Sequence, residues 1–412
     1  MALVGCADPC DPATLDAALR VASAGEVVEA GACRYEASFT VPPGVTLRGQ
    51  GSASTIVAGS GAGSAIVVGD GAVLEALGVE VARGRGVSAS EARVTLRDVV
   101  ILGPLDAAGA AALGPAPTPT ETATHGLVIT AGGRADAPVE LSNVEVRGFA
   151  RFGALLIDSH VVWEGGAASE SLGTGIMASG GSLEAADLEV CSIWRGSSPF
   201  GYGLVTRGGA SVETDRLVLC DNEGAGALHD GAGAVHRSLD ASGNEDAALW
   251  VQRVASFTLE GATLTGNRLA GVVLVDADAA TIEDSSIAGT REATRIVDDL
   301  ELRAGDGVQA ILPTASGLRL ARVTLSGNER AGIVLQAADG IVPATVATDV
   351  VVEAEGDALG ALAQTESALL DPSVWGAGLE RRGAALANDP AAIDRVSVLG
   401  AVAPMFLPPP DP

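Results

Sequence analysis

A short internal repeat is the feature that most limits what this chain can fold into. Several segments share one outline: an apolar strand, a small turn that often reads Gly-Asn, then Ala-Gly and a second apolar strand. Leu264-Thr265-Gly266-Asn267, for example, leads to Gly271-Val272-Val273-Leu274. A fixed period of this kind is typical of solenoids, in which each repeat stacks on its neighbours.

The base period of the repeat is 22–23 residues. The residues aligned with Thr265 are Arg147, Ser169, Cys191, Cys220, Ser242, Ala288 and Ser326, and Ala58, Glu80 and Leu102 continue the series upstream. From Arg147 onward the steps are 22, 22, 29, 22, 23, 23 and 38 residues, so two coils carry insertions. Helical solenoids have longer repeats, and the leucine spacing of leucine-rich repeats is absent. The period therefore predicts a parallel β-helix of about a dozen coils, ~4.8 Å apart.

The composition agrees with a narrow, layered core. The 412 residues are 47% hydrophobic but only 3% aromatic, and 54 are glycine. Aliphatic side chains must therefore fill the interior, and glycines suit frequent turns. The net charge is −27 and all 25 basic residues are arginine, which disfavours nucleic acid and anionic membranes as partners. The chain contains no apolar run long enough to predict a transmembrane segment.

The asparagines of the Gly-Asn turns share one register position. They are Asn222, Asn244, Asn267 and Asn328. We expect their amides to stack as a ladder in which each bonds to the next, and the alternative is ordinary turn chemistry.

The N-terminus carries a motif similar to a bacterial lipobox. In Leu3-Val4-Gly5-Cys6 the cysteine would be lipidated and become the first mature residue, and the alternative is a chance match. Ala7 would then be the second residue, where an Asp would signal inner-membrane retention. We therefore expect a lipoprotein of the bacterial outer membrane or a secreted protein.

Lipidation of Cys6 would leave four of the five cysteines for disulfides. We predict the pairs Cys10–Cys33 and Cys191–Cys220, and the alternative is five buried thiols. Cys191 and Cys220 lie one coil step of ~4.8 Å apart, inside the range of about 4.4–6.8 Å between the Cα atoms of a disulfide.

The opening of the chain resembles that of the pectin-lyase-like family of right-handed parallel β-helix proteins. Residues 13–24 are predicted to form a short amphipathic helix with Thr14 or Asp11 as its cap, and strands, Tyr35 and Gly44-Val45-Thr46-Leu47-Arg48-Gly49-Gln50-Gly51 follow. The resemblance covers roughly residues 13–350 and implies that this helix plugs the open end of the solenoid. The expected divisions are a signal-peptide remnant (1–5), a capping segment (6–24), coils (25–352) and a C-terminal cap with a proline-rich tail (353–412).

The resembled fold occurs in lyases, hydrolases, epimerases, phage tailspikes and non-catalytic surface proteins, so it does not give the function. The carboxylate cluster with which lyases bind Ca²⁺ is matched only by Asp276-Ala277-Asp278 and Asp298-Asp299. The Asn-Thr-Asp and Arg-Ile-Lys motifs of the hydrolases are missing, and Asp298-Asp299 follows His125 instead of preceding it. We therefore assign no family catalytic residue, metal or cofactor.

One group of residues nevertheless suits a sugar. Arg207, His229, Asp230 and Trp250 are expected at equivalent positions of neighbouring coils, ~5–10 Å apart. With an acidic sugar, His229 would shuttle protons beside Arg207 and Asp230, and Trp250 would stack on the ring. In the alternative, His229 and Trp250 face the core, and Arg207 pairs with Asp230 at the surface.

The strand after the Ala-Gly turn is apolar at every position. One register position holds Val128, Leu155, Met177, Val205, Leu228, Leu249, Val273 and Val334. Because its flanking positions are also apolar, we expect both faces of this sheet to be covered. Insertions near 104–124, 195–201 or 290–305, the C-terminal segment or a second molecule could cover it.

These observations favour a non-catalytic, lipid-anchored β-helix that binds polysaccharide or another surface protein, or that serves as a structural element. The alternative is a polysaccharide lyase, hydrolase or epimerase acting on an acidic glycan. The low aromatic content disfavours the long sugar groove that such an enzyme would need.

Overall fold

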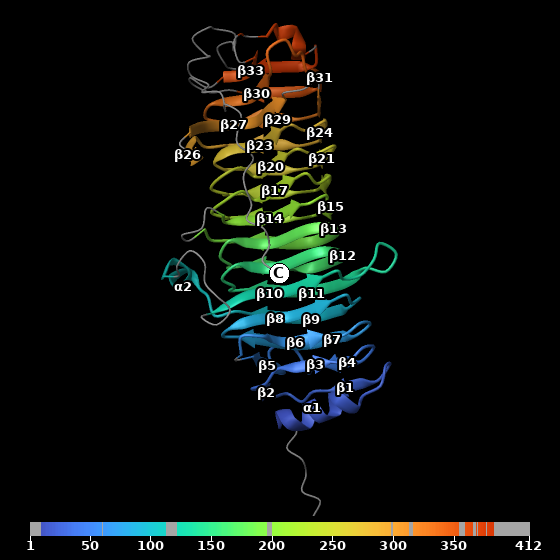
Figure 1. The fold of residues 1–412 in the computed structure, drawn as a ribbon. Coiled ribbons are helices and arrows are strands. Elements are labelled where there is room, and N and C mark those ends of the chain that lie inside the picture. Colours follow the sequence, from blue (N-terminus) through green and yellow to red (C-terminus); the bar gives the residue numbers. More distant parts are fainter. Residues whose placement is uncertain are drawn as a thin grey trace, which may run out of the picture. The chain divides into compact units, whose positions relative to one another are not determined.

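The computed structural model describes residues 10–59, 61–112, 122–195, 200–297, 300–312, 316–353, 359–365, 368, 370–375 and 377–382. Two compact units, Met1–Gly224 and Ala225–Pro412, are described here each by itself. Each is a stack of coils in which a strand pairs in parallel with its counterpart in the next coil (Figure 1). The predicted fold class, an all-β parallel β-helix, is confirmed. None of the described helices is long and apolar enough to cross a membrane.

The first unit forms three parallel sheets around one core. The first sheet contains β3 (Phe39–Val41), β6 (Ser64–Val68), β8 (Gly84–Ser90), β10 (Ala123–Thr130), β14 (Tyr202–Arg207) and the starts of β12 (Phe152–Ser169) and β13 (Thr174–Cys191). The second sheet contains β1 (Val27–Glu29), β4 (Thr46–Arg48), β15 (Ser211–Asp215), the middle of β12 and β13, and the starts of β7 (Val73–Val81), β9 (Thr95–Leu102) and β11 (Val139–Arg147). The third sheet contains β2 (Arg34–Tyr35), β5 (Ile56–Gly59), β16 (Val218–Cys220) and the ends of β7, β9, β11, β12 and β13.

The second unit repeats the three sheets. The first sheet contains β17 (Ala227–Asp230), β20 (Leu249–Gln252), β23 (Leu269–Val275), β27 (Leu300–Leu312), β30 (Ala331–Ala337) and β33 (Leu359–Thr365). The second contains β18 (Ala234–Arg237), β21 (Phe257–Glu260), β24 (Ala279–Glu283), β28 (Gly317–Ala321) and β31 (Ala344–Thr348). The third contains β19 (Asp240–Ser242), β22 (Thr263–Thr265), β25 (Ser286–Ala288), β29 (Thr324–Ser326), β32 (Val350–Glu353) and β34 (Leu379–Arg382). Parallel pairing thus continues beyond residue 352.

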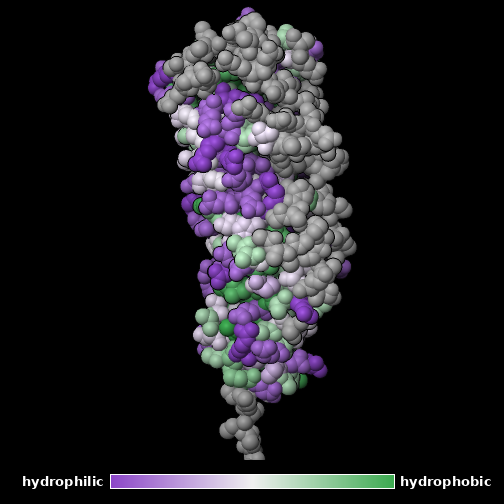
Figure 2. All heavy atoms as spheres, turned by 90° about the vertical axis from the view of Figure 1, so that its left-hand side faces the viewer, coloured by the Kyte–Doolittle hydropathy of each residue, from purple (hydrophilic) through white to green (hydrophobic). Residues whose placement is uncertain are grey.

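Besides the N-terminal helix, three described elements lie outside these sheets. β26 (Ala293–Val297) pairs antiparallel with the start of β27, so the long step after Ala288 contains a hairpin. α2 (Ala107–Ala112) lies in the insertion near 104–124, and a short 3-10 helix, η1, covers Pro372–Trp375. On the side of the second unit seen in Figure 2, most of the coloured surface is hydrophilic.

The predicted N-terminal helix is present. α1 spans Pro12–Val21, three residues shorter at its C-terminal end than expected, and lies beneath β1 in Figure 1. Asp11 is the cap, because its carboxylate accepts a hydrogen bond from the Ala13 backbone N–H at 3.1 Å. Leu15 and Leu19 are buried, so the helix places an apolar face on the first coils of its unit.

The predicted register of the marker residues is confirmed wherever the pairing lies within one unit. The marker residues pair in series as Ala58–Glu80–Leu102–Arg147–Ser169–Cys191–Cys220 in the first unit and Ser242–Thr265–Ala288–Ser326 in the second. Both predicted disulfides are present, with Cα atoms 5.4 Å apart in Cys10–Cys33 and 4.6 Å apart in Cys191–Cys220.

The asparagine ladder exists in part. All four asparagines are buried, and Asn244 Nδ2 donates to Asn267 Oδ1 at 2.8 Å. Beyond Asn267 the next coil has Thr290 instead, whose backbone N–H donates to Asn328 Oδ1 at 3.1 Å. Asn222 Nδ2 donates to the Val190 carbonyl at 3.2 Å. The amides therefore bond to backbone groups inside the turn more often than to each other.

From Val128 onward, the predicted apolar row of the first sheet and its neighbours are buried on both faces, as the sequence predicts, whereas Val67 in β6 is 43% exposed. Leu127 and Val128 alternate in direction, yet they are only 0% and 8% exposed, and Val272 and Val273 are both 0% exposed.

One predicted register position in the first sheet is wrong. Trp250 rather than Leu249 pairs with Leu228 and Val273, because Ala248, not Ala247, occupies the place of the glycine in the Ala-Gly turn.

Candidate functional site

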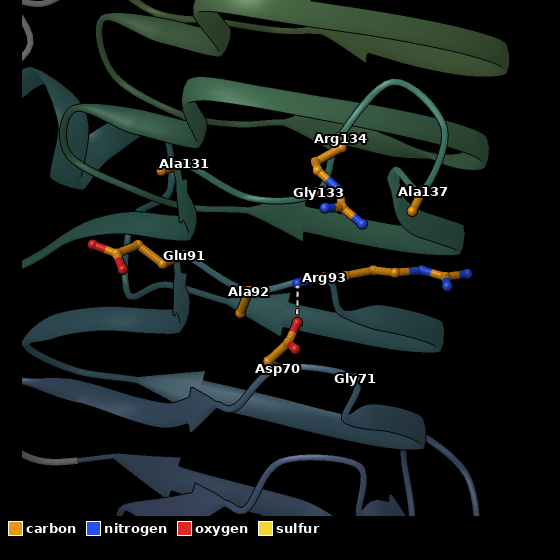
Figure 3. A pocket seen from close by; sticks show the side chains of 9 residues that line it. All are labelled: Asp70, Gly71, Glu91, Ala92, Arg93, Ala131, Gly133, Arg134 and Ala137. Carbon is orange, nitrogen blue, oxygen red and sulfur yellow. Dashed lines mark hydrogen bonds between the residues drawn. The ribbon is translucent and has the colours of Figure 1, made fainter.

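A cleft of about 550 Å³ opens at the corner between the first and second sheets of the first unit (Figure 3). It forms where stacked coils turn from one sheet to the next. Glu91 after β8 and Ala131 after β10 adopt left-handed backbone angles, with φ of 53° and 49°, and redirect the chain toward β9 and β11. The cleft is lined by Asp70, Gly71, Glu91, Ala92, Arg93, Ala131, Gly133, Arg134 and Ala137.

Asp70 and Arg93 form the floor of this corner cleft. The backbone N–H of Arg93 donates to Asp70 Oδ1 at 2.8 Å, which fixes the carboxylate one coil below (Figure 3). The Arg93 guanidinium reaches Glu140 Oε1 at 2.8 Å, and its side chain is still 51% exposed. The Arg93 guanidinium therefore keeps exposed donors, and in Figure 3 its side chain extends away from Asp70.

Arg134 overhangs the cleft from a short turn. Its backbone exchanges hydrogen bonds with Ala137 at 3.0 and 2.9 Å, which closes the turn and makes it rigid. The guanidinium is 80% exposed, and its Nε lies 3.6 Å from a carboxylate oxygen of Asp136. In Figure 3 the Arg134 side chain extends toward the level of Arg93, whereas Glu91 extends to the opposite side. The pairing of Arg134 is loose, so this cation is available to a ligand.

The cleft offers hydrogen-bond donors and acceptors together. Guanidinium groups donate in a fixed fork, and carboxylates accept from hydroxyls at up to four positions. None of its described lining residues is a histidine, cysteine, serine or tyrosine. Guanidiniums beside carboxylates suit the binding of a hydroxyl-rich molecule.

A second cleft in the first unit, of about 350 Å³, is lined in part by Arg34, Glu36 and Glu80. Arg34 donates to Glu36 at 3.0 Å and to Glu80 at 2.6 Å. Its cation is therefore already engaged by two carboxylates, which makes this cleft less suited to a ligand than the corner cleft.

The residues expected to hold a sugar do not form one exposed group. Arg207 belongs to the first unit, at the end of β14, and the other three belong to the second. His229 and Trp250 are both 0% exposed, and Asp230 binds the guanidinium of Arg253 with Nε 2.9 Å from Oδ1. His229 pairs with Val251, so it does not share a register position with Trp250. The burial of His229 agrees with the alternative in which it faces the core. Trp250 is buried too, but it lies on the opposite face of its strand from Val251, the partner of His229, so it does not face the core as that alternative expects. Asp230 binds Arg253.

His229 instead meets a second buried histidine, which the sequence analysis did not identify. Its Nε2 lies 2.8 Å from Nε2 of His236, and both rings are fully buried. Burial lowers the pKa of His236 to about 4. Burial and the neighbouring His236 lower the pKa of His229 well below its usual value. The pair is therefore neutral at pH 7, with one ring donating to the other.

Two other clusters have structural explanations. Asp306 and Arg330 form a buried ion pair in the second unit, in which Nε lies 2.8 Å from Oδ1. Burial raises the pKa of Asp306, while Arg330 opposes this shift. Among the described residues, the one group with metal-ligand spacing is Glu189, Cys191 and Cys220, but both of its sulfur atoms are in the disulfide.

The sequence did not reveal the corner cleft. Asp70, Arg93 and Arg134 lie in turns, and nothing in their local sequence distinguishes these arginines from the other 23. Only the stacking of three corners in successive coils brings them together. Cys6, Asp298 and Asp299 lie outside the described residues.

No protein-family model and no curated protein sequence matches the chain. Among solved structures, the Dettilon tailspike protein gp208 is similar over 86% of this chain and 64% of its own, with 10% identity and a TM-score of 0.49. Tailspike protein 2 from an Escherichia coli O157:H7 bacteriophage is similar over 67% of this chain, with 11% identity and a TM-score of 0.44, and this chain covers only 40% of it. The catalytic unit of a GH87 α-1,3-glucanase from Streptomyces thermodiastaticus is similar over 93% of this chain and 69% of its own, with 14% identity and a TM-score of 0.42.

Proposed function

We propose that the protein is a non-catalytic polysaccharide-binding protein of the bacterial cell envelope, and that the corner cleft binds a hydroxyl-rich, neutral segment of the glycan. The observation that carries the proposal is the set of side chains in the cleft, where Arg93 and Arg134 can donate beside the acceptor Asp70. Stacked coils hold the backbone of these groups in place, so binding has to order the arginine side chains but not the chain that carries them.

A neutral glycan fits better than an acidic one. The net charge of −27 repels polyanions at long range, and the cleft contains carboxylates as well as guanidiniums. Sugar hydroxyls both donate and accept, so they can satisfy both kinds of group.

The test compares the parent with Arg134→Ala and Arg93→Ala by affinity electrophoresis and calorimetry on a panel of neutral glucans and mannans, with alginate as the acidic comparator. We expect each variant to weaken binding to the best neutral glycan about 3–10-fold, since a charged hydrogen bond contributes about 1–2 kcal/mol before solvent screening. Arg20→Ala on α1 is the control, because it removes the same charge away from the cleft and leaves affinity unchanged.

Two results would contradict the proposal. One is unchanged affinity in both cleft variants. The other is turnover, seen as new reducing ends or as unsaturated uronate absorbance, because the proposed protein releases neither product from any glycan in the panel.

The cell-envelope location rests on two features. Two disulfides are bonds that persist in oxidising compartments, and Cys6 follows a lipobox-like sequence. With a full signal sequence, we expect globomycin-sensitive processing and a lipid mass on Cys6, and both should be abolished by Cys6→Ser. Processing that is insensitive to globomycin would contradict the anchor without affecting the glycan proposal.

A further inference from the structure

The outward face of the first sheet in the second unit is unlike an ordinary solenoid surface. His229 contacts His236 on the opposite sheet, so it points into the coil. Val251 pairs with His229 and points the same way, and therefore its neighbours Trp250 and Gln252 point outward.

The outward face, so defined, contains two rows of stacked residues. One row is Leu228, Trp250, Val273, Gln309, Val334 and Leu362, and the other includes Gln252, Ile311, Gln336 and Gln364. Every residue of the first row is at most 2% exposed, and the four of the second row are 1–8% exposed. A face that points away from its own core is thus excluded from solvent.

Four amide atoms of the glutamines on this outward face lack partners, although Gln252 Oε1 accepts from Trp250 Nε1 at 3.2 Å. Among the described residues, nothing hydrogen-bonds to Gln252 Nε2, Gln309 Oε1 or either amide atom of Gln364. Leaving these groups buried and unpaired is unfavourable, because each has lost its water without gaining a partner. The missing partner must therefore offer acceptors to two nitrogens and donors to two oxygens, within reach of apolar side chains.

A peptide backbone meets this requirement, because each non-proline residue supplies one N–H and one C=O. Its apolar side chains would cover Trp250, Val273 and Val334. A glycan could bond to the amides, but its hydroxyls would be left unpaired against the aliphatic side chains.

The second unit has such a peptide in its own sequence. Thirty residues, 383–412, follow β34. Within them, Val396-Ser397-Val398-Leu399-Gly400-Ala401-Val402 and Met405-Phe406-Leu407 form the most apolar run. The four coil steps from Leu362 to Trp250 span ~19 Å, which about six residues of extended chain can cover. Residues 383–395 are then long enough to serve as the connection.

We propose that the outward face of the first sheet in the second unit binds the chain's own residues 396–407 as an intramolecular strap. The strap supplies backbone partners to the glutamine amides and covers the apolar row.

The test is hydrogen exchange followed by mass spectrometry on the full-length monomer. We expect peptides from 396–407 to exchange at least about tenfold more slowly than the same sequence as a free peptide. The variant Leu399→Asp/Phe406→Asp should lose this protection, and peptides covering Trp250 and Gln309 should then exchange faster. Pro409→Asp is the control outside the strap and should exchange as the parent does.

Both substitutions of the paired charge variant lie in the strap, so we expect the coils to fold as in the parent. Slow exchange of β21 and β22 in this variant would verify that the coils are intact. A second variant, Val273→Asp, should release the strap from the other side of the contact. The proposal is overturned by free-peptide exchange rates for 396–407 in the parent, or by protection that survives both variants. Protection that disappears on dilution would also overturn it, because the occupant would then be a second copy of the chain.

Discussion

At the scale of single residues, the core of the second unit contains two ionisable groups where an all-aliphatic interior was expected. Nε2 of His229 and Nε2 of His236 are 2.8 Å apart, so one ring must donate and the other accept. Protonation of both rings would place two hydrogens between these nitrogens. Burial in addition disfavours a charge on either ring.

This geometry predicts acid sensitivity. The folded-state pKa of His236 is about 4, below the ordinary value of about 6.5, so the unfolded chain takes up protons first as pH falls. The free energy of unfolding should therefore be unaffected above about pH 6.5 and decrease by about 1.4 kcal/mol per pH unit per histidine below it, until the folded-state pKa is reached. Urea unfolding between about pH 7.5 and pH 5 measures this decrease.

The matched control is the double variant His229→Gln/His236→Gln, which keeps a donor and an acceptor in the core but cannot titrate. Carboxylates contribute equally to both proteins, so the difference between their pH profiles isolates the histidines. Equal losses of stability in the two proteins over this pH range would refute the prediction.

At the scale of the coil, a column of glycines precedes the first sheet. Its members include Gly86, Gly126, Gly153 and Gly175 in the first unit and Gly271, Gly307 and Gly332 in the second. At each, an added Cβ would lie 2.4–2.7 Å from the backbone oxygen of the glycine in the next coil. The Ala-Gly signature of the repeat thus marks a position where neighbouring coils approach too closely for a Cβ atom.

Gly271→Ala should therefore destabilise the protein by about 1–3 kcal/mol, because its Cβ would be 2.6 Å from the Gly307 oxygen and 2.3 Å from Ile287 Cγ2. Gly233→Ala is the matched control in the same unit, since its nearest neighbour is 3.7 Å away. Thermal unfolding followed by circular dichroism compares the two variants. A melting temperature for Gly271→Ala equal to that of Gly233→Ala would show that the corner can relax.

Much of the fold could be predicted from the sequence because each coil repeats the same contacts. Aligning one marker, Thr265, was enough to obtain register pairs such as Ala288–Ser326 across a 38-residue step. The error at Trp250 arose because alanine replaces the corner glycine in that coil. The constant interval of six residues after Asn222, Asn244 and Asn267 would have located it correctly.

The candidate site could not be predicted in the same way. Arg93 and Arg134 come from turns of different lengths, and only Arg134 follows a tight turn stabilised by its own backbone hydrogen bonds. The repeat fixes the positions of strand residues but not of side chains in such corners. The sequence period therefore cannot predict which corner side chains lie close together. The buried histidine pair was missed for a related reason, because His229 and His236 lie on different sheets of one coil and periodicity aligns only residues of different coils.

At the scale of the whole molecule, charge is the property most relevant to partners. The chain has 52 acidic and 25 basic residues, and every basic residue is an arginine. Many arginines are engaged by carboxylates one coil away, as Arg322 is with Asp284, where Nε lies 2.5 Å from Oδ1. Local pairing leaves the long-range field negative, and this field acts on any charged polymer before it reaches the corner cleft.

The field and the cleft together predict how binding depends on salt. Attraction of a neutral glycan relies on short-range hydrogen bonds, so its affinity should change less than about twofold between roughly 20 and 300 mM NaCl. Alginate must approach a chain with net charge −27, so its binding should be undetectable at low salt and become no stronger than that of the neutral glycan at high salt. Affinity electrophoresis across this salt range measures both responses. Alginate binding that is strongest at low salt and weakens as salt rises would show that local arginines dominate the net field, and the preference for a neutral glycan would then be wrong.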